Sequence, residues 1–294
     1  MNKIKKFFDS LFHRTPLMKV RLDRGPKDGA EKTFVFLHGI AASYNTFRAT
    51  LSEIALDADF KNCRLIALDL IGFGRSPKLK DWPYTYESYS KSLRKTLKKL
   101  KVQEPVVLVG HSMGCLIAVD FVLRQKEKDH RLQVESMILV SPPIMKPEDA
   151  RKLPERFMIR AYEDLAKHTH DKAVLTITSF ISKVSSFENK NFDTPAFRRS
   201  MDNLITNAET WKKIRKISIP TTILHGVTDP LVVGENLTEL AKKNRNIRYI
   251  SSLGGHDILG PKQKKLIKAM ADTMRSVRVR SAAKVTFEQP KLDR

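Results

Sequence analysis

Short apolar runs alternate with helical stretches from residue 33 to residue 140. The runs are continuous in Val, Ile and Leu, a pattern typical of strands that are covered on both faces. Because helices separate these strands, the pattern predicts a parallel sheet joined by right-handed crossovers. The predicted strands are 33–37, 63–70, 106–110 and 136–140, and the predicted helices are 44–56, 86–100 and the segment after residue 112.

This alternation stops at Pro142 and Pro143 and returns near residue 219. Residues 144–216 are charged, have a helical pattern and contain no convincing buried strand, so we expect a helical cap inserted into the sheet domain. The remaining predicted elements are strands at 219–226 and 246–250 and helices at 235–243 and 261–277. The fold class predicted is α/β, with a mostly parallel sheet, helices on both faces and a helical cap insertion.

The predicted core therefore comprises residues 18–143 and 217–277, and two basic segments, 1–17 and 278–294, flank it. The C-terminal segment is poorly periodic, which predicts a mobile tail. The N-terminal segment places its apolar residues on one helical face, and these are Ile4, Phe7, Phe8, Leu11 and Phe12. This face fits an interfacial helix on an anionic membrane, with residues 1–14 making the contact, and it fits equally a helix packed on the body of the protein.

The sequence favours a cytoplasmic location, peripheral at the membrane surface if residues 1–14 bind there. No apolar run approaches the roughly 20 residues that span a bilayer. Residues 1–14 are basic and apolar like a signal peptide, but Asp9 and His13 interrupt the apolar part and no small-residue cleavage site follows. The two cysteines, Cys63 and Cys115, are too few for a disulfide framework or a metal site and are predicted to be reduced core thiols.

The net charge of the chain indicates anionic partners but does not identify them. The chain has 54 Lys+Arg residues against 32 Asp+Glu residues, a formal net charge of +22 at pH 7. Such an excess attracts anionic surfaces of any kind, including nucleic acid and phospholipid. Nucleic-acid binding is disfavoured because no supporting motif accompanies the charge.

Candidate chemistry begins at the corner Gly110-His111-Ser112-Met113-Gly114, where a strand leads directly into a helix. Such a corner holds the central residue in a strained turn, and the flanking glycines remove side chains that would collide there. Ser112 would then expose its hydroxyl beside the N-terminus of a helix, where negative charge is stabilised. The alternative, a serine that merely caps a helix, is common, but the strand before and the helix after favour a nucleophile.

A serine nucleophile needs a base and an acid that orients the base. His256 lies in a glycine-flanked loop after the last predicted strand, and Asp229 follows the preceding strand. Both positions fall at the carboxyl edge, where open parallel sheets build their sites. An aspartate before a proline is also common turn chemistry. The chain order Ser112, Asp229, His256 is the order that this chemistry takes on such a sheet.

The backbone N–H groups of Ile40 and Met113 are the expected donors to an oxyanion. Gly39, after the first predicted strand, lets the backbone pass close to the corner. His38 and His111 are expected to fix loops or to pack. The segment 68–77 is expected to be a loop-shaping turn, with Asp69 ending a strand; the next helix begins too late for a phosphate cradle.

The segments FLHGIAAS, LDLIGFGRSP, GHSMG, IPTTILHGVTDPLV and GGHD, in this order, resemble the α/β-hydrolase superfamily, in the group with a helical cap inserted after the sixth strand. The resemblance covers roughly residues 32–274. It implies Ser112 as nucleophile, His256 as base, Asp229 as acid, and Ile40 and Met113 as oxyanion donors. A serine at the corner argues against the haloalkane dehalogenase and epoxide hydrolase branches, which use aspartate. Some relatives place the acid after the preceding strand, and the candidates here are then Glu148 and Asp149.

The sequence thus predicts a serine hydrolase that cleaves an ester-like bond of a small apolar substrate through an acyl-enzyme, with no metal ion and no cofactor. Three alternatives remain: a carbon-carbon bond hydrolase, a cofactor-free perhydrolase, and a ligand receptor without catalysis. Apolar residues of the cap would either line an acyl pocket or pack the cap on the core, and these are Phe157, Met158, Tyr162, Ile177 and Phe180.

Overall fold

The computed structural model describes residues 15–103, 105–125, 132–147, 194–206 and 208–285. They form a seven-stranded sheet with strand order β1-β3-β2-β4-β5-β6-β7. The strands are β1 (Lys19–Arg24), β2 (Lys32–Leu37), β3 (Cys63–Asp69), β4 (Val106–His111), β5 (Val134–Val140), β6 (Thr221–Gly226) and β7 (Ile247–Ser252). Only β1 pairs antiparallel, with β3, and the other five pairings are parallel. The predicted mostly parallel α/β sheet is confirmed.

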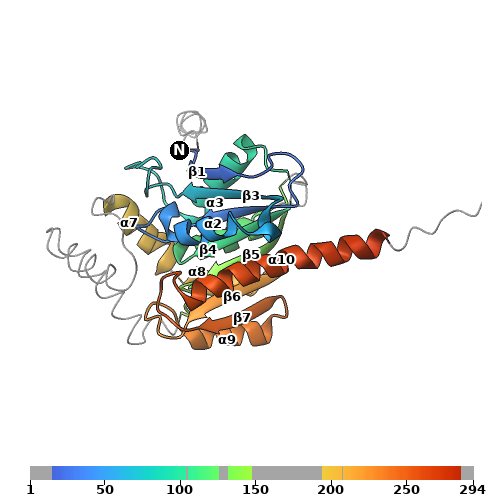
Figure 1. Ribbon diagram of the computed structural model, residues 1–294. Coiled ribbons are helices and arrows are strands. Elements are labelled where there is room, and N and C mark those ends of the chain that lie inside the picture. The colour runs from blue at the N-terminus through green and yellow to red at the C-terminus, as the bar shows by residue number, and fades with distance from the viewer. Residues whose placement is uncertain (1–14, 104, 126–131, 148–193, 207, 286–294) are drawn as a thin grey trace, which may run out of the picture.

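Helices cover both faces of this sheet (Figure 1). Side chains alternate along each strand, so that Val35 and Leu37 face one apolar core and Phe34 and Phe36 face the other. The first core is closed by α3 (Tyr86–Lys99), α4 (Met113–Leu123), α8 (Glu209–Ile214) and α9 (Gly234–Lys243). The second core is closed by the 3-10 turns η1 (Tyr44–Phe47) and η2 (Ala58–Phe60), by α2 (Arg48–Ile54) and by α10 (Pro261–Val285).

Three element predictions need correction. The edge strand β1 was not predicted, because its apolar residues alternate with charges and are only partly buried. The helix predicted at 44–56 is divided into η1 and α2. The last helix does not end at residue 277 but continues to Val285, into the segment expected to be a mobile tail, and Figure 1 shows α10 extending beyond the sheet.

The predicted cap lies between β5 and β6, and five strands precede it in the described chain. Its returning part consists of α7 (Thr194–Ser200), a π-helical turn (Met201–Ile205) and α8. Several predictions fall outside the described residues: the apolar face within 1–14, the cap residues Phe157, Met158, Tyr162, Ile177 and Phe180, the alternative acids Glu148 and Asp149, and residues 286–294. In the part of the chain that is described, no helix has the length and apolar character to cross a membrane.

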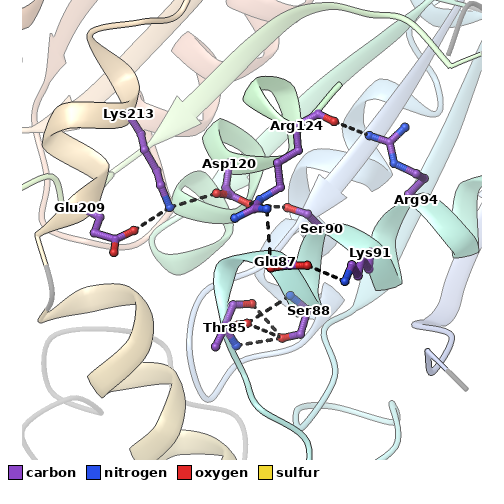
Figure 2. Close-up of polar contacts among 10 residues, drawn as sticks. All are labelled: Thr85, Glu87, Ser88, Ser90, Lys91, Arg94, Asp120, Arg124, Glu209 and Lys213. Atoms are coloured by element: carbon purple, nitrogen blue, oxygen red, sulfur yellow. Dashed lines mark hydrogen bonds and ion pairs between the residues drawn. The ribbon is translucent and has the colours of Figure 1, made fainter. Parts of the chain in front are cut away.

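A network of charges fixes α8 on the core helices (Figure 2). Asp120 on α4 is buried and accepts hydrogen bonds from Ser90 Oγ at 2.8 Å and Arg124 Nε at 2.5 Å. Its other oxygen lies 3.0 Å from Lys213 Nζ of α8. The same ammonium lies 3.5 Å from the centre of the Tyr86 ring on α3. The last part of the segment predicted to form the cap is therefore held by α3 and α4 together.

Candidate active site

Ser112 occupies a strained corner between β4 and α4. Its φ of 50° and ψ of −120° are costly for a residue with a side chain. The flanking glycines make the corner possible, because a Cβ on Gly110 would lie 2.7 Å from the Cys115 nitrogen and one on Gly114 would lie 2.1 Å from the Leu37 oxygen. The local geometry is that of the nucleophile elbow predicted from the sequence.

The loop after β2 runs directly against this corner. A Cβ on Gly39 would lie 3.0 Å from the Ser112 Cβ, so a larger residue would push the loop away. Among the described residues, no protein group accepts a hydrogen bond from the N–H of Ile40 or of Met113. Met113 is the first residue of α4, where the helix dipole favours negative charge. Both groups are thus available as donors beside Ser112.

His256 and Asp229 are in direct contact at the carboxyl edge of the sheet. His256 Nδ1 lies 3.1 Å and 2.9 Å from the two carboxylate oxygens of Asp229, and both residues are buried. A carboxylate only accepts, so Nδ1 carries the proton and Nε2 of the neutral ring is the nitrogen that can accept one.

The Asp229 carboxylate also accepts the N–H of Leu231 at 2.9 Å, so the expected turn chemistry is present as well. Burial raises the pKa of Asp229, but the hydrogen bond and charge of His256 lower it. The N–H of Leu231 and the ammonium of Lys262 add to this lowering, and the pKa of Asp229 lies below its ordinary value. The acid is therefore ionised at neutral pH.

His111 connects the serine corner to the histidine loop. Its Nε2 lies 3.0 Å from the His256 carbonyl oxygen, and the two rings have centroids 5.0 Å apart. Burial, followed by the charge of His256, lowers the pKa of His111 to about 3. His111 is therefore neutral and donates its Nε2–H to that carbonyl. It places Ser112, its neighbour in sequence, near His256, and it fits the expected loop-fixing role.

His38 and Asp69 shape the loops around the site. His38 is buried; its Nδ1–H donates to the Gly39 carbonyl at 2.7 Å, and its Nε2 accepts the N–H of Leu70 at 2.9 Å. Burial lowers the pKa of His38, so it remains neutral. Asp69 accepts the N–H groups of Tyr44 and Arg75 at 2.8 Å and 2.7 Å. These contacts are those of loop-shaping residues, as expected.

One buried charge at this edge was missed by sequence reasoning. Lys262, in the first turn of α10, is fully buried, and its Nζ lies 3.0 Å from Ser141 Oγ and also contacts the Gly255 carbonyl. Lys264, Lys265 and Lys268 follow it within the next six residues of the same helix. No sequence signal separates Lys262 from these neighbours.

Known proteins share this architecture. The alpha/beta hydrolase fold family matches residues 32–170. The probable lysophospholipase BODYGUARD 2 of Arabidopsis thaliana is 34% identical over 124 residues, which cover 41% of this chain and 25% of that protein. This chain spans about a quarter of the length of this relative, and about the same share of three similar plant proteins.

Two further comparisons cover more of the chain. The pimeloyl-[acyl-carrier protein] methyl ester esterase of Legionella pneumophila (strain Lens) is 28% identical over 239 residues, which cover 79% of this chain and 89% of that protein. The solved structure of the esterase EaEST from Exiguobacterium antarcticum has a TM-score of 0.70 at 19% identity and covers 88% of this chain and 95% of its own. The chain has the α/β-hydrolase fold, and its residues 32–170 match the model of that family.

Proposed function

We propose that the chain is a serine hydrolase of carboxylic esters. Ser112 Oγ bonds to the ester carbonyl carbon while His256 Nε2 takes the serine proton, and the carbonyl electron pair moves onto oxygen. The N–H groups of Ile40 and Met113 stabilise that oxyanion. The alcohol leaves with the proton from His256, and water then hydrolyses the acyl-enzyme by the same steps. Asp229 fixes the imidazole tautomer and stabilises the imidazolium.

The observation that carries this proposal is the buried Asp229–His256 pair, which lies beside the strained Ser112 corner through His111. An aspartate in a simple turn would bond only the backbone. This carboxylate bonds both the Leu231 N–H and a histidine that itself contacts His111, the residue before Ser112. Hydrogen-bonded pairs of this kind are the functional part of a serine triad.

The proposed substrate is a small ester with an apolar acyl group. Two relatives carry names that denote ester cleavage, the methyl ester esterase and the probable lysophospholipase. The site itself offers a nucleophile, a base and two N–H donors, which suit a neutral carbonyl. Among the residues that it brings together, only Lys262 is a fixed cation, and its ammonium is already bonded to Ser141 and Gly255.

A series of nitrophenyl esters with increasing acyl length tests this proposal. Ser112→Ala should lower kcat by about 10⁴-fold or more while thermal unfolding stays as in the wild type, because the serine is the group that forms the covalent bond. A fluorophosphonate should label the wild type on Ser112 and leave the variant unlabelled. Equal turnover in the two proteins would contradict the proposal, and labelling without turnover of any ester would contradict its substrate.

We also propose that residues 1–14 attach the enzyme to anionic membranes from the cytoplasm. The support is the apolar face and basic residues of that segment together with the net charge of +22. Deletion of residues 1–14 should weaken sedimentation with anionic vesicles and leave turnover of a short soluble ester nearly unchanged. Salt should weaken binding of the full chain. Loss of thermal stability on deletion would show instead that the segment packs on the protein.

A further inference from the structure

A lysine ammonium is buried at the carboxyl edge of the sheet, and no carboxylate of the described residues is in hydrogen-bond contact with it. Lys262 is fully buried, and its Nζ donates to Ser141 Oγ at 3.0 Å and to the Gly255 carbonyl oxygen. Removing an ammonium from water costs several kcal/mol unless acceptors replace the solvent. Burial accordingly lowers the pKa of Lys262, while the charges of Asp229 and Asp257 raise it. Because burial of the Lys262 ammonium is unfavourable, we expect it to have a function at this position.

Its two acceptors belong to the two parts of the site that must be held together. Gly255 directly precedes His256, in a loop without regular secondary structure. Ser141 directly follows Val140, the last residue of β5, and the Val140 carbonyl accepts the Ser112 N–H at 3.0 Å. One ammonium therefore links the loop that carries the base to the strand end that fixes the nucleophile.

The strand end is itself strained. Ser141 has a φ of 50°, in the left-handed region, and its N–H donates to the Leu224 carbonyl of β6 at 2.8 Å. That conformation is unfavourable for a residue with a side chain and persists only when its surroundings hold it. The hydrogen bond from Lys262 to the Ser141 hydroxyl supplies such a contact. Strain and buried charge thus occur together at this point.

We infer that Lys262 is a positioning residue, which holds the His256 loop against the end of β5 so that the imidazole meets Ser112 in the reactive geometry. Its ammonium also acts on Asp229, where it favours the ionised acid. The role is indirect, since Lys262 acts through Gly255 and Ser141. The inference rests on the triad proposed above, and it names a fourth side chain on which the rate of that triad depends.

The test compares Lys262→Met with a matched control on the same helix. Lys265 is only partly buried, and its Nζ donates to the Ser251 carbonyl of β7 at 2.5 Å in an exposed hydrogen bond. Lys265→Met therefore also removes one ammonium that bonds a carbonyl at this end of β7. We expect Lys262→Met to lower kcat for a soluble nitrophenyl ester by about 10²-fold, because small misplacements of reacting groups have effects of that size. KM should stay within about twofold, and Lys265→Met should match the wild type.

Ser141→Ala is the milder second variant, useful if Lys262→Met does not fold. It removes one of the two acceptors of Lys262 and leaves the other. We expect a smaller loss of kcat in the same direction, about tenfold, again with little change in KM. Two results together would overturn the inference: kcat is unchanged in Ser141→Ala, and kcat falls equally in Lys262→Met and Lys265→Met. The loss of kcat would then be a general effect of changing α10.

A spectroscopic measurement separates this inference from the proposed activity. The proton between His256 Nδ1 and Asp229 should give a sharp downfield NMR signal in the wild type that broadens in Lys262→Met as the loop loosens. The His38 Nδ1 proton, bonded to Gly39, is the internal reference and should not change. If Ser112→Ala proved fully active, the proposed activity would fail, yet this signal would still decide the role of Lys262. An unchanged His256 signal with unchanged kcat would overturn it.

Discussion

Two buried aspartates form networks of different character in this molecule. Asp120 is bonded by two side chains with permanent charge, Arg124 and Lys213, and by a hydroxyl, and together these join three helices (Figure 2). Asp229 is bonded by a histidine and a backbone N–H at the edge of the sheet. A carboxylate that is bonded by permanent cations stabilises the packing of the helices that carry them. A carboxylate paired with imidazole can stabilise a proton that moves.

The backbone around the two networks does not distinguish them. Near Asp120, α3 begins with a capping box in which Thr85 and Ser88 bond each other's N–H groups, but Tyr84 before it and Ala208 at the start of α8 have φ values of 49° and 51°. At the carboxyl edge of the sheet, Ser112 and Ser141 both have a φ of 50°. The difference between the networks therefore lies in the groups that bond each carboxylate. The comparison predicts that one network mainly determines rate and the other mainly determines stability.

The largest expected effect follows from Asp229→Asn. An amide in this place favours the wrong tautomer of His256, so we expect kcat to fall by about 10³- to 10⁴-fold. Thermal unfolding should change little, because the amide keeps the shape of the side chain and one acceptor. The measurement is turnover of a nitrophenyl ester beside a melting curve. Retention of most activity would show that another acid, outside the described residues, serves His256.

The matching substitution in the second network is Asp120→Asn. We expect the free energy of unfolding to fall by about 2 kcal/mol, the usual loss for a buried hydrogen bond to a charged group. Turnover per folded molecule should stay within about twofold, since the change lies in helices away from the reacting groups. Urea unfolding and active-site titration measure the two quantities. A loss of rate without a loss of stability would reverse the comparison.

The sheet and the triad positions could be predicted because their signals are local. Continuous apolar runs identify buried strands, and Gly110 and Gly114 mark the corner at Ser112. The edge strand β1 gave no such signal, because its residues are partly exposed and charges alternate with apolar residues.

The supporting residues could not be predicted, because their burial depends on contacts between distant segments. Lys262 looks like its helical neighbours until α10 is packed against the end of β5. Asp120 lies in an apolar helix, and its partner Lys213 comes from the far side of the cap. Nothing in either local sequence shows which charges will meet.

A smaller effect should appear in the pH dependence of stability. The pKa of His111 is about 3 in the folded protein, well below the ordinary value of about 6.5, so the unfolded chain binds a proton that the native state does not. Stability therefore falls as pH drops from 6.5 towards 3, by up to about 1.4 kcal/mol per pH unit. His111→Gln keeps an N–H donor for the His256 carbonyl and should remove the part of this slope that comes from His111, while the buried His38 keeps its own part.

Urea unfolding between pH 6 and pH 4 measures that slope in the wild type and in His111→Gln. Thr85→Ala is the control, since it removes the capping hydrogen bond of α3 and no titratable group, and its slope should equal that of the wild type. Equal slopes in the wild type and His111→Gln would show that His111 is not buried in neutral form and that the link between the Ser112 corner and His256 is looser than its geometry indicates.

The smallest expected effect comes from Glu209→Gln. This variant tests whether an exposed partner of Lys213 contributes less to stability than the buried partner Asp120. Lys213 pairs with Asp120 at 3.0 Å and with Glu209 at 2.9 Å, but the Asp120 side chain is 2% exposed and that of Glu209 is 56% exposed. Solvent screens the second pair, so we expect its loss to lower the free energy of unfolding by less than about 0.5 kcal/mol. The same urea experiment measures it beside Asp120→Asn. If Glu209→Gln and Asp120→Asn lowered the free energy of unfolding equally, burial of the Asp120 carboxylate would not matter for α8. A much larger loss in Asp120→Asn shows that this buried carboxylate holds α8 on the core.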